Sequence, residues 1–283
     1  MYVILTVVAR LFSFVPSRYL DSWASGLAFL FFDVFRLRRA LVLKNLDIAL
    51  GDVYELSERI DIGRESYKNF ILTGFEFLRS KKHDIAAHVD VQGQHHIVEA
   101  LKKNQGAYIL CFHLGNWEAM GAHLTRRVAK VSVLVKRVGG KGVNRFVEEL
   151  RLHNGFHWIS RRKRGDGFKG IQEVLAKNEL VGFVMDQARP GEPRLSFFGS
   201  PAKTNTSFAA IWRRQKAPII PAYFHRKSPG HHVFEVQPEL QLTCTSDEEK
   251  DILVHSVLFN KEAEKAIRKY PGHYFWLHDR WKA

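Results

Sequence analysis

Residues 107-AYILCFHLGNWEAMGAHLTRRVA-129 contain the transition that decides the fold. The first six, residues 107–112, form an apolar run without a charge and predict a buried strand. Asn116 is a favourable helix N-cap, and residues 117–129 after it predict a helix. The turn between strand and helix carries His113, and Glu118 lies in the first helical turn.

The same change of pattern recurs along the rest of the chain. Short β-branched or aromatic runs predict strands at residues 88–93, 107–112, 131–137, 180–186, 219–226 and 231–238. Helical stretches alternate with them at residues 94–103, 117–129, 142–154, 167–178, 205–215 and 247–269. This alternation predicts an α/β fold with a central, mainly parallel or mixed sheet flanked by helices. Ligands bind beyond the carboxyl ends of the strands in such sheets, and His113 and Asp186 both stand at such an end.

The N-terminal part predicts helices instead, at residues 17–35, 38–50 and 52–82. Its apolar run is interrupted by Arg10 and bounded by Asp21 and Asp33, so it is too short for a spanning helix, which needs about 18 apolar residues. Without a basic n-region we expect no cleaved signal peptide. Two interpretations stay open: helices lying in a membrane face, or a buried hairpin. We divide the chain into a membrane-associated helical segment, 1–40, and a catalytic domain, 41–283, helical over 41–85 and sheet-containing over 86–283.

The charge of the chain is strongly basic and unevenly distributed. It has 43 Lys and Arg against 29 Asp and Glu, and residues 126–169 alone hold 13 basic and 3 acidic residues. Such a field favours acidic partners, although a generally basic solvated surface is the simpler explanation. A nucleic-acid-binding module would also be basic, but it would not account for the apolar N-terminus or for the LSFFG run at 195–199. We therefore expect no nucleic-acid partner.

His113 and Glu118 suit acid–base chemistry if they converge across the junction of strand and helix. A neutral imidazole can take a proton from a hydroxyl, and a carboxylate on its other nitrogen fixes the tautomer. The helix N-terminus adds N–H donors that could hold an oxyanion. The simpler alternative is that both residues only cap a helix.

Other catalytic chemistries find less support in the sequence. The chain has no G-x-S-x-G nucleophile motif, and no HExxH or second spaced histidine accompanies His113. Cys111 could be a thiol nucleophile, but its apolar surroundings favour a small buried hydrophobe. Cys244 is the only other cysteine of the chain. Two cysteines do not make a disulfide framework, which indicates a reducing, cytosol-facing location. We expect neither a metal nor an organic cofactor.

The segment 183–226 begins at the end of a strand and continues into a long Pro/Gly-containing loop. Long loops in compact domains are usually functional. Polar groups lie beside the LSFFG run, which we expect to be exposed, and predict a substrate with an anionic head and an apolar tail. These groups are Asp186, Arg189, Lys203 and Thr204.

Four segments, in this order, resemble the bacterial lipid A biosynthesis acyltransferase family. They are RLRRALVLKNLDIAL at 36–50, HLGNWE at 113–118, DQARPGEPRLSFFGSPAKT at 186–204 and YPGHYFWLHDRWK at 270–282. The similarity covers nearly the whole chain and is to the late, lauroyl/myristoyl-type enzymes within the wider glycerolipid acyltransferase group. The ending contains His278, which is either structural or near the site.

The resemblance implies transfer of a fatty acyl group from acyl carrier protein to a hydroxyl of a lipid A precursor, an anionic glycolipid. The site would face the cytoplasm at the bacterial inner membrane. The family's His-(four residues)-Asp/Glu motif corresponds to His113 and Glu118, its acceptor block to Asp186 and its upstream basic position to Arg164. Another anionic glycolipid, such as a phosphatidylinositol mannoside, or an aminolipid remains an alternative acceptor.

The mechanism expected from the turn and the resemblance uses His113 as a general base, oriented by Glu118, without a covalent acyl-enzyme. Helix N-terminal amides, with Arg164 or Arg189, would hold the oxyanion. The residues expected to bind substrate are Asn116, Arg164, Asp186, Arg189, Lys203 and Thr204.

Overall fold

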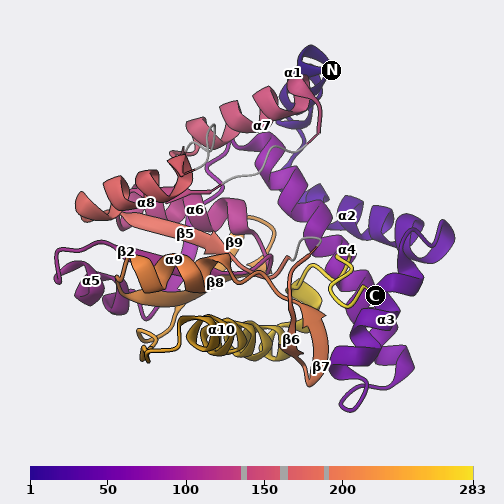
Figure 1. Ribbon diagram of the computed structural model, residues 1–283. Coiled ribbons are helices and arrows are strands. Elements are labelled where there is room, and N and C mark those ends of the chain that lie inside the picture. Colours follow the sequence, from indigo (N-terminus) through magenta and orange to yellow (C-terminus); the bar gives the residue numbers. More distant parts are fainter. Residues whose placement is uncertain (135–138, 160–164, 188–190, 283) are drawn as a thin grey trace.

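The computed structural model describes residues 1–134, 139–159, 165–187 and 191–282 (Figure 1). Its centre is a seven-stranded sheet in the order β1-β9-β8-β2-β5-β3-β4, and a separate β6–β7 hairpin lies apart from it. Neighbouring strands of the large sheet are parallel except β8 and β9, which are antiparallel. The prediction of a mainly parallel or mixed sheet is therefore confirmed.

All six predicted strands are present, and three more were not predicted. The strands of the large sheet are β1 (His88–Gln92), β2 (Ala107–Cys111), β3 (Val131–Val133), β4 (His157–Trp158), β5 (Leu180–Val184), β8 (Ile219–Ser228) and β9 (His231–Val236). The hairpin consists of β6 (Arg194–Phe197) and β7 (Ser200–Lys203). The unpredicted strands β4, β6 and β7 have two to four residues each, too short for a recognisable alternation.

Helices cover both faces of the sheet, because both faces of its central strand β2 are apolar. Tyr108 and Leu110 pack in a core with residues of α8 (Asp166–Ala176), α9 (Ser207–Arg214) and α10 (Glu248–Lys269). Ile109 and Cys111 pack on the opposite face with α5 (His95–Leu101) and α6 (Trp117–Arg127). This period of two, with every residue buried, is the pattern expected of a strand at the centre of an α/β sheet.

The N-terminal part, up to residue 79, is helical and lies at one end of the sheet (Figure 1). It contains α1 (Tyr2–Phe12), the short 3-10 helix η1 (Ser17–Tyr19), α2 (Leu20–Phe29), the π-helix η2 (Leu30–Val34), α3 (Arg39–Leu50) and α4 (Leu56–Arg79). Helix α1 also packs on α7 (Lys141–His153), where the Tyr2 hydroxyl donates a hydrogen bond to Glu149 at 2.5 Å. Tyr2 and Glu149 thus tie α1 to α7.

Several large apolar side chains of this N-terminal part face outwards. The exposed ones on α1 and the following turn are Val3, Ile4, Val7, Val8, Leu11 and Phe14. Among the described residues, no single helix is long and apolar enough to cross a membrane. The segments Tyr2–Phe12 and Ser17–Val34 together have the length and apolar composition of a membrane span, but the chain bends by 102° between them.

The C-terminal tail, from the short turn η3 (Pro271–His273) onward, crosses the sheet edge and packs on the β6–β7 hairpin. Phe197 of the hairpin is fully buried and stacks on Trp281, with ring centroids 5.3 Å apart. Phe198 is also buried and lies near Trp276. The expectation that the LSFFG run is exposed is therefore wrong, because aromatic side chains of the tail cover it.

Candidate active site

The register of the sheet brings His113 and Asp186 together. Strands β2 and β5 are parallel neighbours with Cys111 opposite Val184, so the residues two positions beyond each strand meet at the carboxyl edge. His113 Nδ1 lies 2.8 Å from one oxygen of Asp186, and the His113 backbone N–H donates to the other at 3.0 Å. The imidazole is thus held by a carboxylate from a neighbouring strand.

Burial and charge make this pair asymmetric. The Asp186 side chain is 2% exposed and the His113 side chain 22%. Burial raises the pKa of Asp186, but the charge and hydrogen bonds of His113, with the charge of Arg280, hold that pKa below its ordinary value. An ionised carboxylate only accepts hydrogen bonds, so His113 Nδ1 donates and Nε2 is left as the nitrogen that can receive a proton.

Glu118 has a different partner. Its carboxylate is bound in a bidentate way by Arg151 of α7, with the shortest contact 2.5 Å from Nη2 to Oε1 and a second of 3.0 Å from Nε to Oε2. Both side chains are largely buried, with exposed fractions of 8% for Glu118 and 18% for Arg151. The expectation that Glu118 orients His113 is not met in this structure. Glu118 instead joins α6 to α7.

The turn between His113 and Glu118 is fixed by two polar residues of α4, Thr73 and Glu76. Thr73 donates to the carbonyl of Gly115 at 3.1 Å, and Asn116 donates to Glu76 at 2.5 Å. Gly115 has φ +63°, and a Cβ there would lie 1.9 Å from the carbonyl oxygen of Phe224, so only glycine fits. The turn is therefore tightly constrained.

Asn116 serves this framework. Its Oδ1 accepts from the Ala119 amide at 2.9 Å, which makes it the predicted N-cap of α6, and its side chain is completely buried. Because both ends of its amide are occupied by Ala119 and Glu76, the structure does not place Asn116 where a substrate could touch it, contrary to our expectation.

The C-terminal tail forms the other wall of the site. The Phe275 amide donates to the carbonyl of His113 at 3.0 Å, and the Gly115 amide donates to the carbonyl of His273 at 2.9 Å. Burial and the neighbouring Asp186 raise the pKa of the Tyr274 hydroxyl. The tail therefore runs directly beside the strand end that carries His113.

Two further residues of the tail, His278 and Arg280, lie in the electrostatic field of the site. Burial lowers the pKa of His278, while the charge of Asp186 partly opposes this effect. Arg280 is 2% exposed and donates to Asn260 at 2.8 Å. The sequence left the position of His278 open and gave no signal for Arg280, since its neighbours lie far away in the chain.

The remaining predicted substrate-binding residues are dispersed. Thr204 is buried and accepts a hydrogen bond from Asn260 at 3.1 Å, so it belongs to the interior network around Arg280. Lys203 ends β7 and is half-buried. Arg164 and Arg189 lie outside the residues that the structure describes.

Comparison with known proteins decides the family. A sequence model described as bacterial lipid A biosynthesis acyltransferase matches residues 1–283. The chain belongs to this family. It is thus an acyltransferase of lipid A biosynthesis at the level of the family, which implies an acyl donor and a lipid acceptor. A search of curated proteins gave no match.

Apolar rings surround the imidazole of this acyltransferase. The ring of Trp117 meets that of His113 edge-on at 4.9 Å, and the ring of Phe275 lies 6.2 Å away. Phe70, which is 41% exposed, packs on Phe275 at 4.9 Å. His113 is thus bordered by aromatic surface that can receive an apolar substrate.

Cys111 and metal ligands can be judged on the same geometry. Cys111 is 3% exposed, and burial raises the pKa of its thiol far above the ordinary value, which keeps it protonated. It is the small buried hydrophobe that the apolar run indicated.

Within the described ranges, no group of three or more His, Cys, Asp or Glu side chains is arranged to hold a metal ion.

Proposed function

We propose that this acyltransferase moves a fatty acyl group from acyl carrier protein to a hydroxyl of a lipid A precursor at the cytoplasmic face of the inner membrane. The observation that carries the proposal is the partly exposed imidazole of His113, held by the buried carboxylate of Asp186. The family supplies the reaction class, acyl transfer in lipid A biosynthesis.

In the proposed mechanism, Nε2 of His113 takes the proton of the acceptor hydroxyl as its oxygen attacks the thioester carbonyl carbon. The C–S bond of the resulting tetrahedral intermediate then breaks. The departing thiolate receives the proton from Nε2, which yields an ester and a free thiol. Asp186 stabilises the protonated imidazole throughout, the role that the sequence had suggested for Glu118.

The negative charge that develops on the carbonyl oxygen needs donors close to the imidazole. In the described part of the chain, Asn116 accepts from the amide of Ala119, while the amides of Trp117 and Glu118 have no backbone acceptor. These two N–H groups, at the positive end of the α6 dipole, are our proposed oxyanion site. The Glu118–Arg151 ion pair keeps this helix end in position.

Features of the surface support the proposed location and acyl donor. The exposed apolar residues of α1 would insert into the membrane interface, next to the lipid acceptor. Acyl carrier protein is acidic and would approach the basic segment 126–169. Part of that charge is already paired, as Arg126 bonds Asp84 and Arg145 bonds Glu149.

A substrate panel tests the proposal. Purified protein in neutral detergent is incubated with acyl carrier protein thioesters and, in parallel, a lipid A precursor, a phosphatidylinositol mannoside and an aminolipid, and products are identified by mass spectrometry. We expect an ester only on the lipid A precursor, and none when acyl-coenzyme A replaces acyl carrier protein. Preferential acylation of either other lipid would contradict the acceptor assignment.

A further inference from the structure

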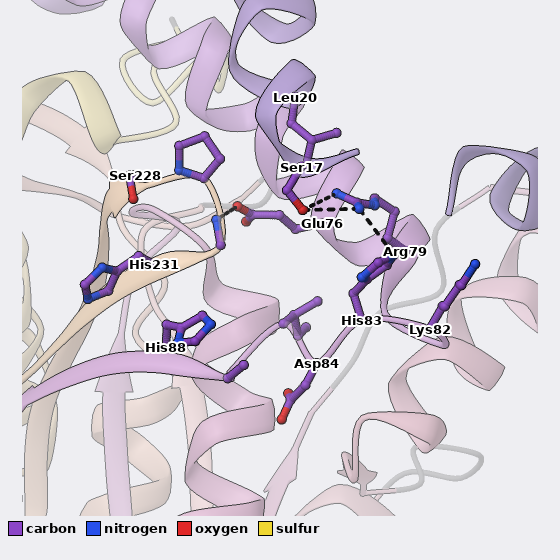
Figure 2. Close-up of a pocket in the computed structure, with 14 residues that line it drawn as sticks. Ser17, Leu20, Glu76, Arg79, Lys82, His83, Asp84, His88, Ser228 and His231 are labelled. Atoms are coloured by element: carbon purple, nitrogen blue, oxygen red, sulfur yellow. Dashed lines mark hydrogen bonds between the residues drawn. The ribbon is translucent and has the colours of Figure 1, made fainter. Parts of the chain in front are cut away.

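A cavity of about 670 Å³ lies beside the C-terminal end of α4 (Figure 2). One wall comes from the end of α4 and the following turn, with Arg79 and His83 side by side, and the opposite wall carries His88 and His231. His88 and His231 are adjacent because they are paired at the starts of the parallel strands β1 and β9. The volume is in the range of sites for small molecules.

The carboxylates around this cavity are already paired with bases. Glu76 is bound by Arg226 at 2.7 Å, and Asp84 by Arg126 at 2.5 Å. Arg79, by contrast, has no carboxylate within 4.0 Å among the residues described, although it is only 4% exposed. Among the described residues, the cavity thus carries a buried cation that feels the charge of Glu76 but forms no salt bridge.

The hydrogen bonds of Arg79 are also incomplete. Its two terminal nitrogens reach Ser17 Oγ only at 3.3 and 3.4 Å, and its Nε has no partner in the described structure. His83 cannot help, because its Nε2 lies 2.8 Å from the carbonyl of Ser13, which can only accept, so Nε2 carries a proton and does not accept from Arg79. In the described structure, these N–H groups make no hydrogen bond to a carbonyl of the last turn of α4, although the dipole at that helix end favours a cation.

A buried guanidinium that faces a cavity and has unsatisfied N–H donors is a favourable binding site for an anion. The planar guanidinium fits the oxygens of a phosphate. Each charge-assisted hydrogen bond to a phosphate oxygen would satisfy an N–H group of Arg79 that now has a long hydrogen bond or none. The histidines of the opposite wall can add donors. Burial lowers the pKa of Arg79, with Glu76 opposing this, and a bound anion would favour the charged form further.

We propose that this cavity binds the phosphate of a membrane lipid headgroup. The lipid source follows from the neighbouring surface: Ser17 and Leu20 line the cavity, and the exposed apolar side chains of Phe14, Tyr19 and Trp23 lie within a few residues of them in sequence. Acyl chains on this surface would leave the phosphate facing Arg79. The site is distinct from His113 and does not depend on the proposed acyl transfer.

Calorimetric titration tests the site without any turnover. Full-length protein in neutral detergent is titrated with monomeric dihexanoyl-phosphatidic acid and, separately, with inorganic phosphate. Arg79→Gln should weaken lipid binding about 10- to 100-fold, because it removes charge-assisted hydrogen bonds. Arg18→Gln is the matched control, since Arg18 is an exposed cation beside the cavity but not in its lining, and it should bind like wild type.

A second variant guards against misfolding of Arg79→Gln. Ser17→Asp places a carboxylate beside the guanidinium, so it should raise the midpoint of thermal unfolding and abolish lipid binding together. Unchanged binding in both Arg79→Gln and Ser17→Asp would overturn the phosphate site. Inorganic phosphate binding as tightly as the short-chain lipid would overturn the assignment to a lipid headgroup.

Discussion

Two buried carboxylates flank the turn at residues 113–118, and their partners separate their roles. Asp186 is bound to an imidazole, a group that can both accept and donate a proton. Glu118 is bound to the guanidinium of Arg151, a group that stays charged in proteins and does not exchange its proton in catalysis at neutral pH. A carboxylate on an imidazole can therefore take part in proton transfer, whereas one on a guanidinium chiefly fixes geometry.

This difference explains why a sequence motif need not be a contacting pair. His113 and Glu118 belong to one short stretch, but the strand end and the helix end direct them to partners on β5 and α7. Both are held within the same framework. The predictions below separate the proton-transferring pair from the framework pair.

Removing the imidazole should have the largest effect. His113→Ala is expected to lower acyl transfer at least about a hundredfold while the protein stays folded, because the general base is lost. Steady-state transfer from acyl carrier protein measures this, with circular dichroism as the folding check. The exposed His95→Ala is the matched control and should keep full activity. Near-normal turnover by His113→Ala would remove this residue from the mechanism.

Asp186→Asn should have the next largest effect. Neutralising the partner of His113 is expected to reduce transfer by about ten- to a hundredfold and to change the shape of the pH–rate profile, since the imidazolium loses its counter-charge. Asp52→Asn, at an exposed position, should leave both unchanged. An unaltered profile for Asp186→Asn would show that Asp186 does not act through His113.

The framework pair should act mainly on stability. Glu118→Gln and Arg151→Gln should each lower the free energy of unfolding by about 1–3 kcal/mol, with the partial exposure of Arg151 keeping the loss modest. The double variant should lose little more than either single one, because they break the same interaction. Thermal unfolding measures the cycle. Additive losses, or a Glu118→Gln pH–rate profile altered like that of Asp186→Asn, would break the comparison.

Glu76, which accepts a hydrogen bond from Asn116 of the turn, should affect the stability of the protein only at acidic pH. Burial raises the pKa of Glu76, but the charges of Arg226 and His232 and hydrogen bonds from Arg226 and Gly230 lower it from 4.5 to about 2. Since the folded state has the lower pKa, this stabilisation is complete above pH 4.5 and is lost as the pH falls towards 2. Urea unfolding between pH 7 and 2.5 measures it. Glu76→Gln should flatten that decline, and an equally steep decline would contradict the ionised pair.

The sequence predicted the sheet well because each central strand is short, apolar and bounded by turns. It also placed His113 and Asp186 at strand ends, yet it could not pair them, since the pairing depends on the register of β2 against β5. Nothing in one chain sequence gives that register. Arg151 was missed as the partner of Glu118 for the same reason: the two lie 33 residues apart.

The tail was the hardest part to predict. The run at 195–199 has the composition of an exposed lipid-binding loop, but Phe197 stacks on Trp281, which follows it by more than eighty residues. Arg280 lies within the same packed region, with its guanidinium over Phe197. Long-range packing of this kind decides exposure, and local composition does not reveal it.

The tautomer of His113 tests the central claim most directly. Nitrogen-15 NMR of protein labelled at histidine, with His113→Gln to assign the signals, reports which ring nitrogen carries the proton at neutral charge. The Asp186 contact predicts a protonated Nδ1 and a bare Nε2, and Asp186→Asn should disturb this state while Glu118→Gln leaves it intact. A proton on Nε2 in the wild type, or a signal that responds to Glu118→Gln and not to Asp186→Asn, would contradict the account.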